Sequence, residues 1–298
     1  PLRSGQLATL LSRERPGAIV GSKCLTRPLR FRSRRPVPEF TGSWNARRVR
    51  RAATRANVPG WLFVVLVTAL VEASIRLFDL DDSVATPSST FRALAEGISS
   101  GTLSGEIGTT LESYAEGFAL AIAGAVVLGV VIGSSRTLLD ASSLVIEFLR
   151  PIPAVALIPL AILLFGLGTP MHRFVIAYAA VWPILINTLY GVRGTDRLLH
   201  DVARTSGVTR LGALLRVTLP SSLPSIATGI RVSASIALLV GVTAEFVTPG
   251  TGGIGAYMQR QQFAYQIPEL YAAVVLVGAL GYTINALPRV AERRIVFW

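Results

Sequence analysis

The chain has 298 residues and a net charge of +12; 51% of its residues are apolar and only 15% are charged. A soluble domain carries roughly 25% charged residues. The composition therefore indicates a membrane protein and excludes a collagen-like repeat, a disulfide scaffold and a chain that is disordered throughout. Two His and one Cys are too few for a four-ligand His/Cys zinc site, so we expect no metal in this chain.

Residues 1–56 are expected to form a separate, Arg-rich tail. Residues 1–55 hold 14 of the 29 basic residues and only two acids, so the rest of the chain is neutral overall. Scattered prolines and weak apolar periodicity predict a disordered cytoplasmic leader. The composition also resembles that of a transit peptide, and basic residues can contact nucleic acid or anionic lipid. Because the tail has no recognisable binding motif, we expect no nucleic-acid partner.

Residues 57–298 are expected to form an all-α membrane domain with six transmembrane helices in the lipid bilayer. A membrane helix needs about 20 mostly apolar residues. Six such stretches are present, at residues 56–78, 117–135, 151–172, 174–192, 224–247 and 270–288. The second stretch contains a row of glycines that would let a neighbouring backbone approach closely: Gly117, Gly124, Gly129 and Gly133.

The third stretch is rich in proline. Pro151 and Pro153 lie at its start, and Pro159 lies inside it. Proline removes a helical hydrogen bond and kinks the helix. In a membrane, the freed carbonyls need partners from the protein or from water in a cavity. Pro153 and Pro159 are therefore candidates for lining a translocation path, and a plain structural kink is the alternative.

The fifth stretch carries two charged residues, Arg231 and Glu245. On a helix they lie within about 40° of one face but about 21 Å apart along the axis, so they cannot pair with each other. Charged residues in a span usually face the bundle interior or a water path. Both residues are candidates for a translocation path or gate, and structural pairing with other partners is the alternative.

Basic residues are unevenly divided between the two sides of the membrane. With the N-terminus inside, the inside segments hold 24 Lys and Arg and the outside segments hold three. The inside segments are residues 1–55, 136–150, 191–223 and 289–298. Because short cytoplasmic loops carry an excess of Lys and Arg, this bias predicts that both termini are cytoplasmic.

Residues 191–223 form the longest internal loop, and their pattern predicts that they fold. Apolar residues recur near helical spacing through residues 198–215, Gly207 interrupts them, and Pro220 and Pro224 follow. This order predicts a short helix, a break at Gly207, a second helical piece and a proline entry into the fifth span.

The same loop resembles a family signature. Asp201-Val202-Ala203, Gly207 and Val217-x-Leu219-Pro220 match the spacing of Glu-Ala-Ala-x3-Gly-x9-Ile-x-Leu-Pro, with mild departures at three positions. This is the loop signature of bacterial ABC importer permeases, which are binding-protein-dependent. Three further stretches, 150–168, 228–246 and 251–255, look like permeases of the aliphatic sulfonate, taurine and nitrate subgroup. The resemblance covers residues 57–298.

The resemblance implies a transmembrane subunit of an ATP-driven importer in the bacterial plasma membrane. It implies a homodimer of permeases, two ATPase subunits and an external solute-binding protein, moving a small anionic solute by alternating access. The segment 196–212 would couple the permease to the ATPase. Arg204 could pair with an acid of the ATPase, or it could be basic only because cytoplasmic loops are rich in Lys and Arg. The coupling residues that the resemblance implies are Asp201, Val202, Ala203, Arg204, Gly207, Val217, Leu219 and Pro220.

The chain has no Walker motif, so we expect no catalytic activity and no cofactor of its own; ATP and Mg would bind the partner ATPase. The run Gly250–Gly255 lacks the Lys-Ser/Thr and the preceding strand of a phosphate loop, and it is expected to be an external turn. The alternative function is a stand-alone carrier or channel driven by an ion gradient. Such carriers commonly have broken helices in repeated halves, and the sequence has no visible repeat.

Overall fold

The computed structural model describes residues 58–78 and 84–295, and the predicted tail lies outside these residues. The regular structure of the described residues is helical. The helices are α2 (Val58–Leu77), α3 (Pro87–Ser99), α4 (Thr102–Gly133), α5 (Arg136–Leu149), α6 (Ile158–Phe165), α7 (Thr169–Arg193), α8 (Arg197–Thr205), α9 (Arg210–Ala213), α10 (Leu219–Val247), α11 (Ile254–Phe263) and α12 (Ile267–Ile295). A 3-10 turn (Ala154–Leu157) precedes α6, and a π turn (Leu214–Thr218) joins α9 to α10.

Four of the described helical segments are long and apolar enough to cross a membrane. They are α4, α7, the run Arg210–Val247 that ends in α10, and Ile267–Ala286 of α12. A fifth is obtained if α5 and the segment Ala154–Phe165 count as one span that is bent by 83°. The prediction of an all-helical polytopic membrane protein is thus confirmed, whereas the predicted six spans exceed the four or five that the described residues provide.

The third predicted stretch is not one continuous helix. Its first residues form the break after α5, Pro153 caps the 3-10 turn, and α6 is only eight residues long. The segment 136–150, predicted as an inside loop, instead forms α5, whose N-cap Ser135 accepts a hydrogen bond from the Leu138 N–H. Two prolines within three residues cannot continue a helical hydrogen-bond ladder, which explains the break.

The fifth span begins earlier than predicted. Pro220 lies in the first turn of α10 and Pro224 lies inside that helix. The preceding π turn extends the helical run back to Arg210, so the ring of Pro220 removes one N–H donor from a continuous helical run. The predicted proline entry into the fifth span therefore holds for Pro220, whereas Pro224 lies inside the helix.

The core is formed where α7 packs between α4 and α10. A Cβ atom built on Gly129 of α4 would lie 2.7 Å from the Thr188 side chain of α7, and one on Gly117 would lie 2.8 Å from the Arg173 carbonyl oxygen. The missing side chains let the two helices approach closely. Gly124 differs from this expectation, because a Cβ atom there meets none of the described residues within 4 Å.

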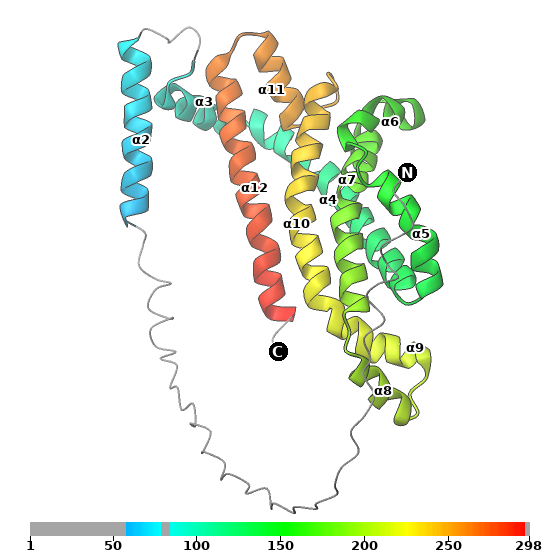
Figure 1. Ribbon diagram of the computed structural model, residues 1–298. Helices are drawn as coiled ribbons and strands as arrows, with labels where there is room; N and C mark the ends of the chain where they lie inside the picture. The colour runs from blue at the N-terminus through cyan, green and yellow to red at the C-terminus, as the bar shows by residue number, and fades with distance from the viewer. Residues whose placement is uncertain (1–57, 79–83, 296–298) are drawn as a thin grey trace, which may run out of the picture. The chain divides into compact units, whose positions relative to one another are not determined.

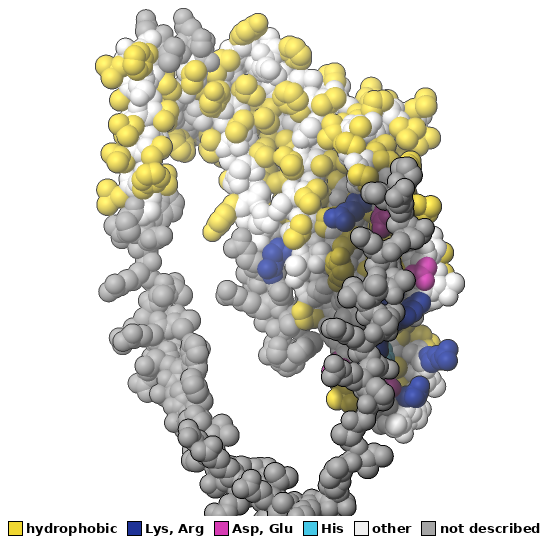
Figure 2. All heavy atoms as spheres, in the orientation of Figure 1, with side chains coloured by type: hydrophobic (Ala, Val, Ile, Leu, Met, Phe, Trp, Pro, Cys, Tyr) yellow, Lys and Arg dark blue, Asp and Glu magenta, His cyan; other side chains and the backbone are white. Residues whose placement is uncertain are grey.

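The bundle has two chemically different ends (Figure 1). The helices α7, α10 and α12 run side by side; α8, α9 and the last turns of α12 lie toward one end, and α3 and α11 toward the other. Charged side chains that are visible in Figure 2 gather toward the end with α8 and α9, whereas apolar side chains cover the surface around α2, α6 and α11. On the face that Figure 2 shows, the visible charged side chains are thus separated from the apolar surface around α2, α6 and α11.

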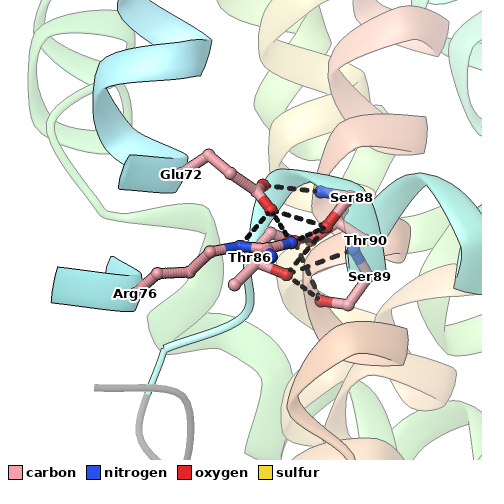
Figure 3. A network of polar contacts seen from close by, with 6 residues as sticks. All are labelled: Glu72, Arg76, Thr86, Ser88, Ser89 and Thr90. Carbon is pink, nitrogen blue, oxygen red and sulfur yellow. Dashed lines mark hydrogen bonds and ion pairs between the residues drawn. The ribbon is translucent and has the colours of Figure 1, made fainter. Parts of the chain in front are cut away.

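A polar network links α2 to the start of α3 (Figure 3). The Glu72 carboxylate accepts hydrogen bonds from the Ser88 N–H at 3.0 Å, from the Ser88 hydroxyl at 2.8 Å and from Arg76. Thr86 is the N-cap of α3 and accepts from the Ser89 N–H. The free N–H groups of the first turn of α3 are therefore satisfied partly by α2, which holds these two helices together.

Candidate functional site

The segment α8–α9 consists of two short helices, each with a side-chain cap at its N-terminus. The Asp196 carboxylate accepts a hydrogen bond from the Leu198 N–H at 2.9 Å and caps the start of α8. At the other end, the Val208 N–H donates to the Ala203 carbonyl at 3.0 Å. Gly207 lies between them with φ +73°. This is the Schellman ending of a helix, in which glycine takes the left-handed conformation, and it confirms the predicted break at Gly207.

The outer face of α8 is apolar although it is exposed. Leu198 is 66% exposed and Val202 is 55% exposed, whereas Ala203 is buried. Asp201 and Arg204 are exposed beside this face. Large apolar side chains that are surrounded by charges and stay uncovered are typical of a surface that another protein covers.

A groove of about 610 Å³ runs beside α8 and α9. Its walls combine apolar and basic side chains from the two short helices with the last residues of α4, including His200, Arg204, Arg210, Leu211 and Gly133. Two arginines at an apolar groove favour a partner whose apolar residues are bordered by acids.

The eight predicted coupling residues lie in two places. Asp201, Val202, Ala203, Arg204 and Gly207 lie on α8 and its C-terminal turn. The other three lie at the junction with the span: Val217 in the π turn, and Leu219 and Pro220 in the first turn of α10. These three are only partly exposed. They connect the surface element to the spanning helix and do not belong to its outer face.

Glu245 lies in a separate cluster at the opposite end of α10. Its side chain is buried, with 1% exposure. Its Oε2 accepts hydrogen bonds from the Thr110 hydroxyl at 2.9 Å and from the Gly255 N–H at 3.1 Å. The Ile254 N–H donates to the Thr110 hydroxyl oxygen at 2.8 Å. Glu245 therefore holds the N-terminus of α11, where free N–H groups and the helix dipole favour a negative charge.

A second carboxylate completes this cluster, and sequence reasoning missed it. The Gly253 N–H donates to Glu106 Oε2 at 2.6 Å, and Arg260 of α11 forms an ion pair with the same carboxylate. Gly253 has φ +96°, so the turn before α11 needs a residue without a side chain. The only signal in the sequence was that Glu106 and Arg260, an acid and a base 154 residues apart, both lie in segments expected outside the membrane.

The candidate path residues are not all brought together. Pro153 and Pro159 are exposed at the break and in the first turn of α6. Ile158 of α6 shares a core cluster with Ala244 of α10, the residue before Glu245. Pro159 is thus near the C-terminal half of α10, whereas Arg231 is partly buried 14 residues before Glu245 in the same helix.

Comparisons with known proteins find a family model and several relatives to which this chain is similar. The family model "Binding-protein-dependent transport system inner membrane component" matches residues 125–296. A bicarbonate transport system permease protein of Synechococcus elongatus is 33% identical over 166 residues, which are 56% of this chain and 60% of the relative. A nitrate import permease protein of Leptolyngbya laminosa is also 33% identical over 166 residues, which are 56% of this chain and 59% of that protein.

The fold also has a counterpart among solved structures. An inward-facing structure of the MetNI methionine ABC transporter gives a TM-score of 0.53 at 20% identity, covering 63% of this chain and 91% of that chain. The matches span about 60% of the length of the curated relatives. Because the family model matches more than half of the chain, the protein belongs to the family of inner membrane components of binding-protein-dependent transport systems.

Proposed function

We propose that this chain is the membrane-spanning permease subunit of an ATP-driven ABC importer for a small anionic solute. Two copies would form the translocation path and alternate between access from the two sides. Two ATPase subunits would bind at the end with α8, and a solute-binding protein would deliver the solute at the end with α11. ATP and Mg belong to the ATPase in this proposal, because this chain carries no Walker motif.

The observation that carries the proposal is the exposed apolar face of α8. The helix has nine residues and is capped at both ends, so its shape is fixed before any partner binds. A preformed element loses little conformational entropy on binding. The helix is joined through α9 and the π turn to the spanning helix α10, so a displacement of α8 by an ATPase would act directly on a helix that crosses the membrane.

The topology of the proposal places α8 and both termini in the cytoplasm. The excess of Lys and Arg in the segments assigned to the inside supports this orientation. In the described residues, the last turns of α12 lie toward the same end as α8. We include α2 as a sixth span, because most of its apolar side chains are exposed over 20 residues. Residues 1–56 are then a cytoplasmic tail ahead of the permease domain 57–298.

The names of the relatives favour an anionic solute. Bicarbonate and nitrate are the solutes in the names of two of them, and sulfonates and taurine, which the sequence resemblance suggests, share an oxyanion group with them. The solute class that these names share is a small oxyanion.

The test compares two substitutions at Gly207. Among the described residues, a Cβ atom at this position meets nothing within 4 Å, so an added side chain would project outward, where the ATPase would dock. Asn tolerates the left-handed conformation, and Gly207→Asn should keep the ATPase. Gly207→Trp should reduce ATPase retention by roughly tenfold or more, since bulk at the centre of a packed interface is poorly tolerated.

The readouts are co-purification of the cognate ATPase and solute-stimulated ATP hydrolysis in reconstituted membranes. Equal thermal stability of both variants shows that the chain itself is folded. If Gly207→Trp binds the ATPase and supports hydrolysis as the wild type does, α8 is not the coupling element and the proposal fails.

A further inference from the structure

The break between α5 and α6 brings a basic side chain to membrane depth. Tyr178 of α7 donates a hydrogen bond from its hydroxyl to the Leu149 carbonyl at 2.6 Å, which holds the last residue of α5 against α7. Tyr178 is the tenth residue of a 25-residue spanning helix, so it lies about 14 Å from one end and about 22 Å from the other at 1.5 Å per residue. Arg150 follows Leu149 directly and therefore lies well inside the apolar zone.

The Arg150 guanidinium has no partner within the described part of the chain. The side chain is exposed, and no ion pair or side-chain hydrogen bond joins it to any of the described residues. A charged side chain at this depth is costly in lipid, and such residues face the bundle interior or a water-filled cavity. Arg150 must therefore meet water, a counter-ion or a second copy of the chain.

A groove of about 750 Å³ between α5 and α7 supplies the space. Arg150 lies at its deep end beside Pro151, and Arg193 lies near the end of α7 that leads to α8. Ser143 and Tyr190 add hydroxyl groups to the walls, and Glu147 adds one carboxylate. The groove thus carries one net positive charge and connects membrane depth with the end of the bundle that holds α8.

The geometry points to Arg150 as a binding residue for the transported oxyanion, contacted from the groove between α5 and α7. A guanidinium presents planar, paired N–H donors that match the oxygens of nitrate, bicarbonate or a sulfonate. Arg150 is the C-cap of α5, where the carbonyl end of the helix carries partial negative charge, so the guanidinium itself supplies the attraction for an anion. This inference rests on the proposed function, and it adds a residue that the sequence analysis placed in an inside loop.

The test uses a sulfonate-bearing thiol reagent as the probe. Ser143→Cys is introduced into a full-length chain that lacks Cys24, and the complex with its ATPase is reconstituted into membranes. The rate of modification by anionic sulfonatoethyl methanethiosulfonate is divided by the rate for the cationic trimethylammonium analogue. Arg150 lies two helical turns from this position. Because one charge at about 10 Å still acts strongly near a protein surface, Arg150→Gln should lower the ratio about tenfold, and Arg150→Lys should largely preserve it.

Leu138→Cys is the control, because this exposed residue lies on α5 outside the groove and about 18 Å from Arg150 along the helix axis, where salt largely screens the charge. Its ratio should not respond to Arg150→Gln. For the Ser143→Cys chain, an unchanged ratio in the Arg150→Gln background overturns the inference, as does an introduced thiol that no aqueous reagent reaches. Arg150 could instead form an ion pair with an acid of a second copy. In that case Arg150→Gln would leave the ratio unchanged and would weaken the dimer on gel filtration, which also overturns the inference.

The readout separates this inference from the proposed function. The ratio is a property of the groove and needs neither ATP hydrolysis nor knowledge of the natural solute. If Arg150→Gln lowers the ratio in a complex that shows no ATPase coupling, the importer proposal is refuted and the anion site stands. If Arg150→Gln leaves the ratio unchanged in a complex whose ATP hydrolysis is still coupled, the anion site is refuted and the importer proposal stands.

Discussion

Replacing Glu245 by Ala is expected to release the N-terminus of α11 from the bundle. The substitution removes the acceptor of two hydrogen bonds, those from the Thr110 hydroxyl and the Gly255 N–H. A hydrogen bond to a charged group contributes about 1.5–3 kcal/mol, and buried donors that lose their partner add to the penalty. By the same reckoning, we expect Glu245→Ala to cost about 3–6 kcal/mol. Glu245→Gln keeps one oxygen acceptor and should cost less.

The measurement is the thermal unfolding midpoint of the detergent-purified protein, followed by the fraction that remains monodisperse after heating. For a domain of this size, a loss of 1 kcal/mol lowers the midpoint by about 2–4 °C, so Glu245→Ala should lower it by at least about 6 °C. Glu116→Ala is the control, because that carboxylate pairs with Arg173 at a partly exposed surface and such pairs contribute about 0–1 kcal/mol. Equal midpoints for Glu245→Ala and Glu116→Ala would show that Glu245 does not anchor α11.

Two further predictions test the packing and the topology. Gly129→Ala should destabilise the protein by about 1–3 kcal/mol, because the added methyl group overlaps α7. Gly124→Ala has open space around it and should be neutral or stabilising. The unfolding midpoints of the two variants check this, and the reverse order of midpoints would contradict the packing of α4 on α7. In intact cells, an impermeant thiol reagent should label Ser89→Cys and leave Ser206→Cys unlabelled in a chain without its native cysteine; labelling of position 206 from outside would overturn the orientation.

The parts of the fold that depend on local pattern could be predicted from the sequence. The apolar stretches that became α4, α7 and α12 were visible as runs of the required length. The break at Gly207 was visible because the signals that end a helix lie within a few residues of one another. Apolar content alone did not separate a continuous span from a broken one, so the third stretch was predicted as a single helix, although its prolines already indicated a kink.

The features that depend on distant pairing could not be predicted. Glu106 and Gly253 are joined across 147 residues, and a single sequence contains no information on which outer segments meet. The row of four glycines was visible, but the face that each occupies depends on where α7 packs. For that reason Gly117 and Gly129 contact α7, while Gly124 does not. The depth of Arg150 could not be predicted either, since it follows from the contact between Tyr178 and Leu149.

The two carboxylates that hold α11 have a mechanical consequence. Glu106 comes from α4 and Glu245 from α10, and both bind the backbone of the same helix start. Separating α4 from α10 at this end would leave carboxylates and N–H donors without partners at the same time, at a cost of several kcal/mol. These three helix ends must therefore travel as one rigid block. Relative movement of α10 is left to its other end, where the five-residue π turn Leu214–Thr218 provides a joint that an unbroken α-helix lacks.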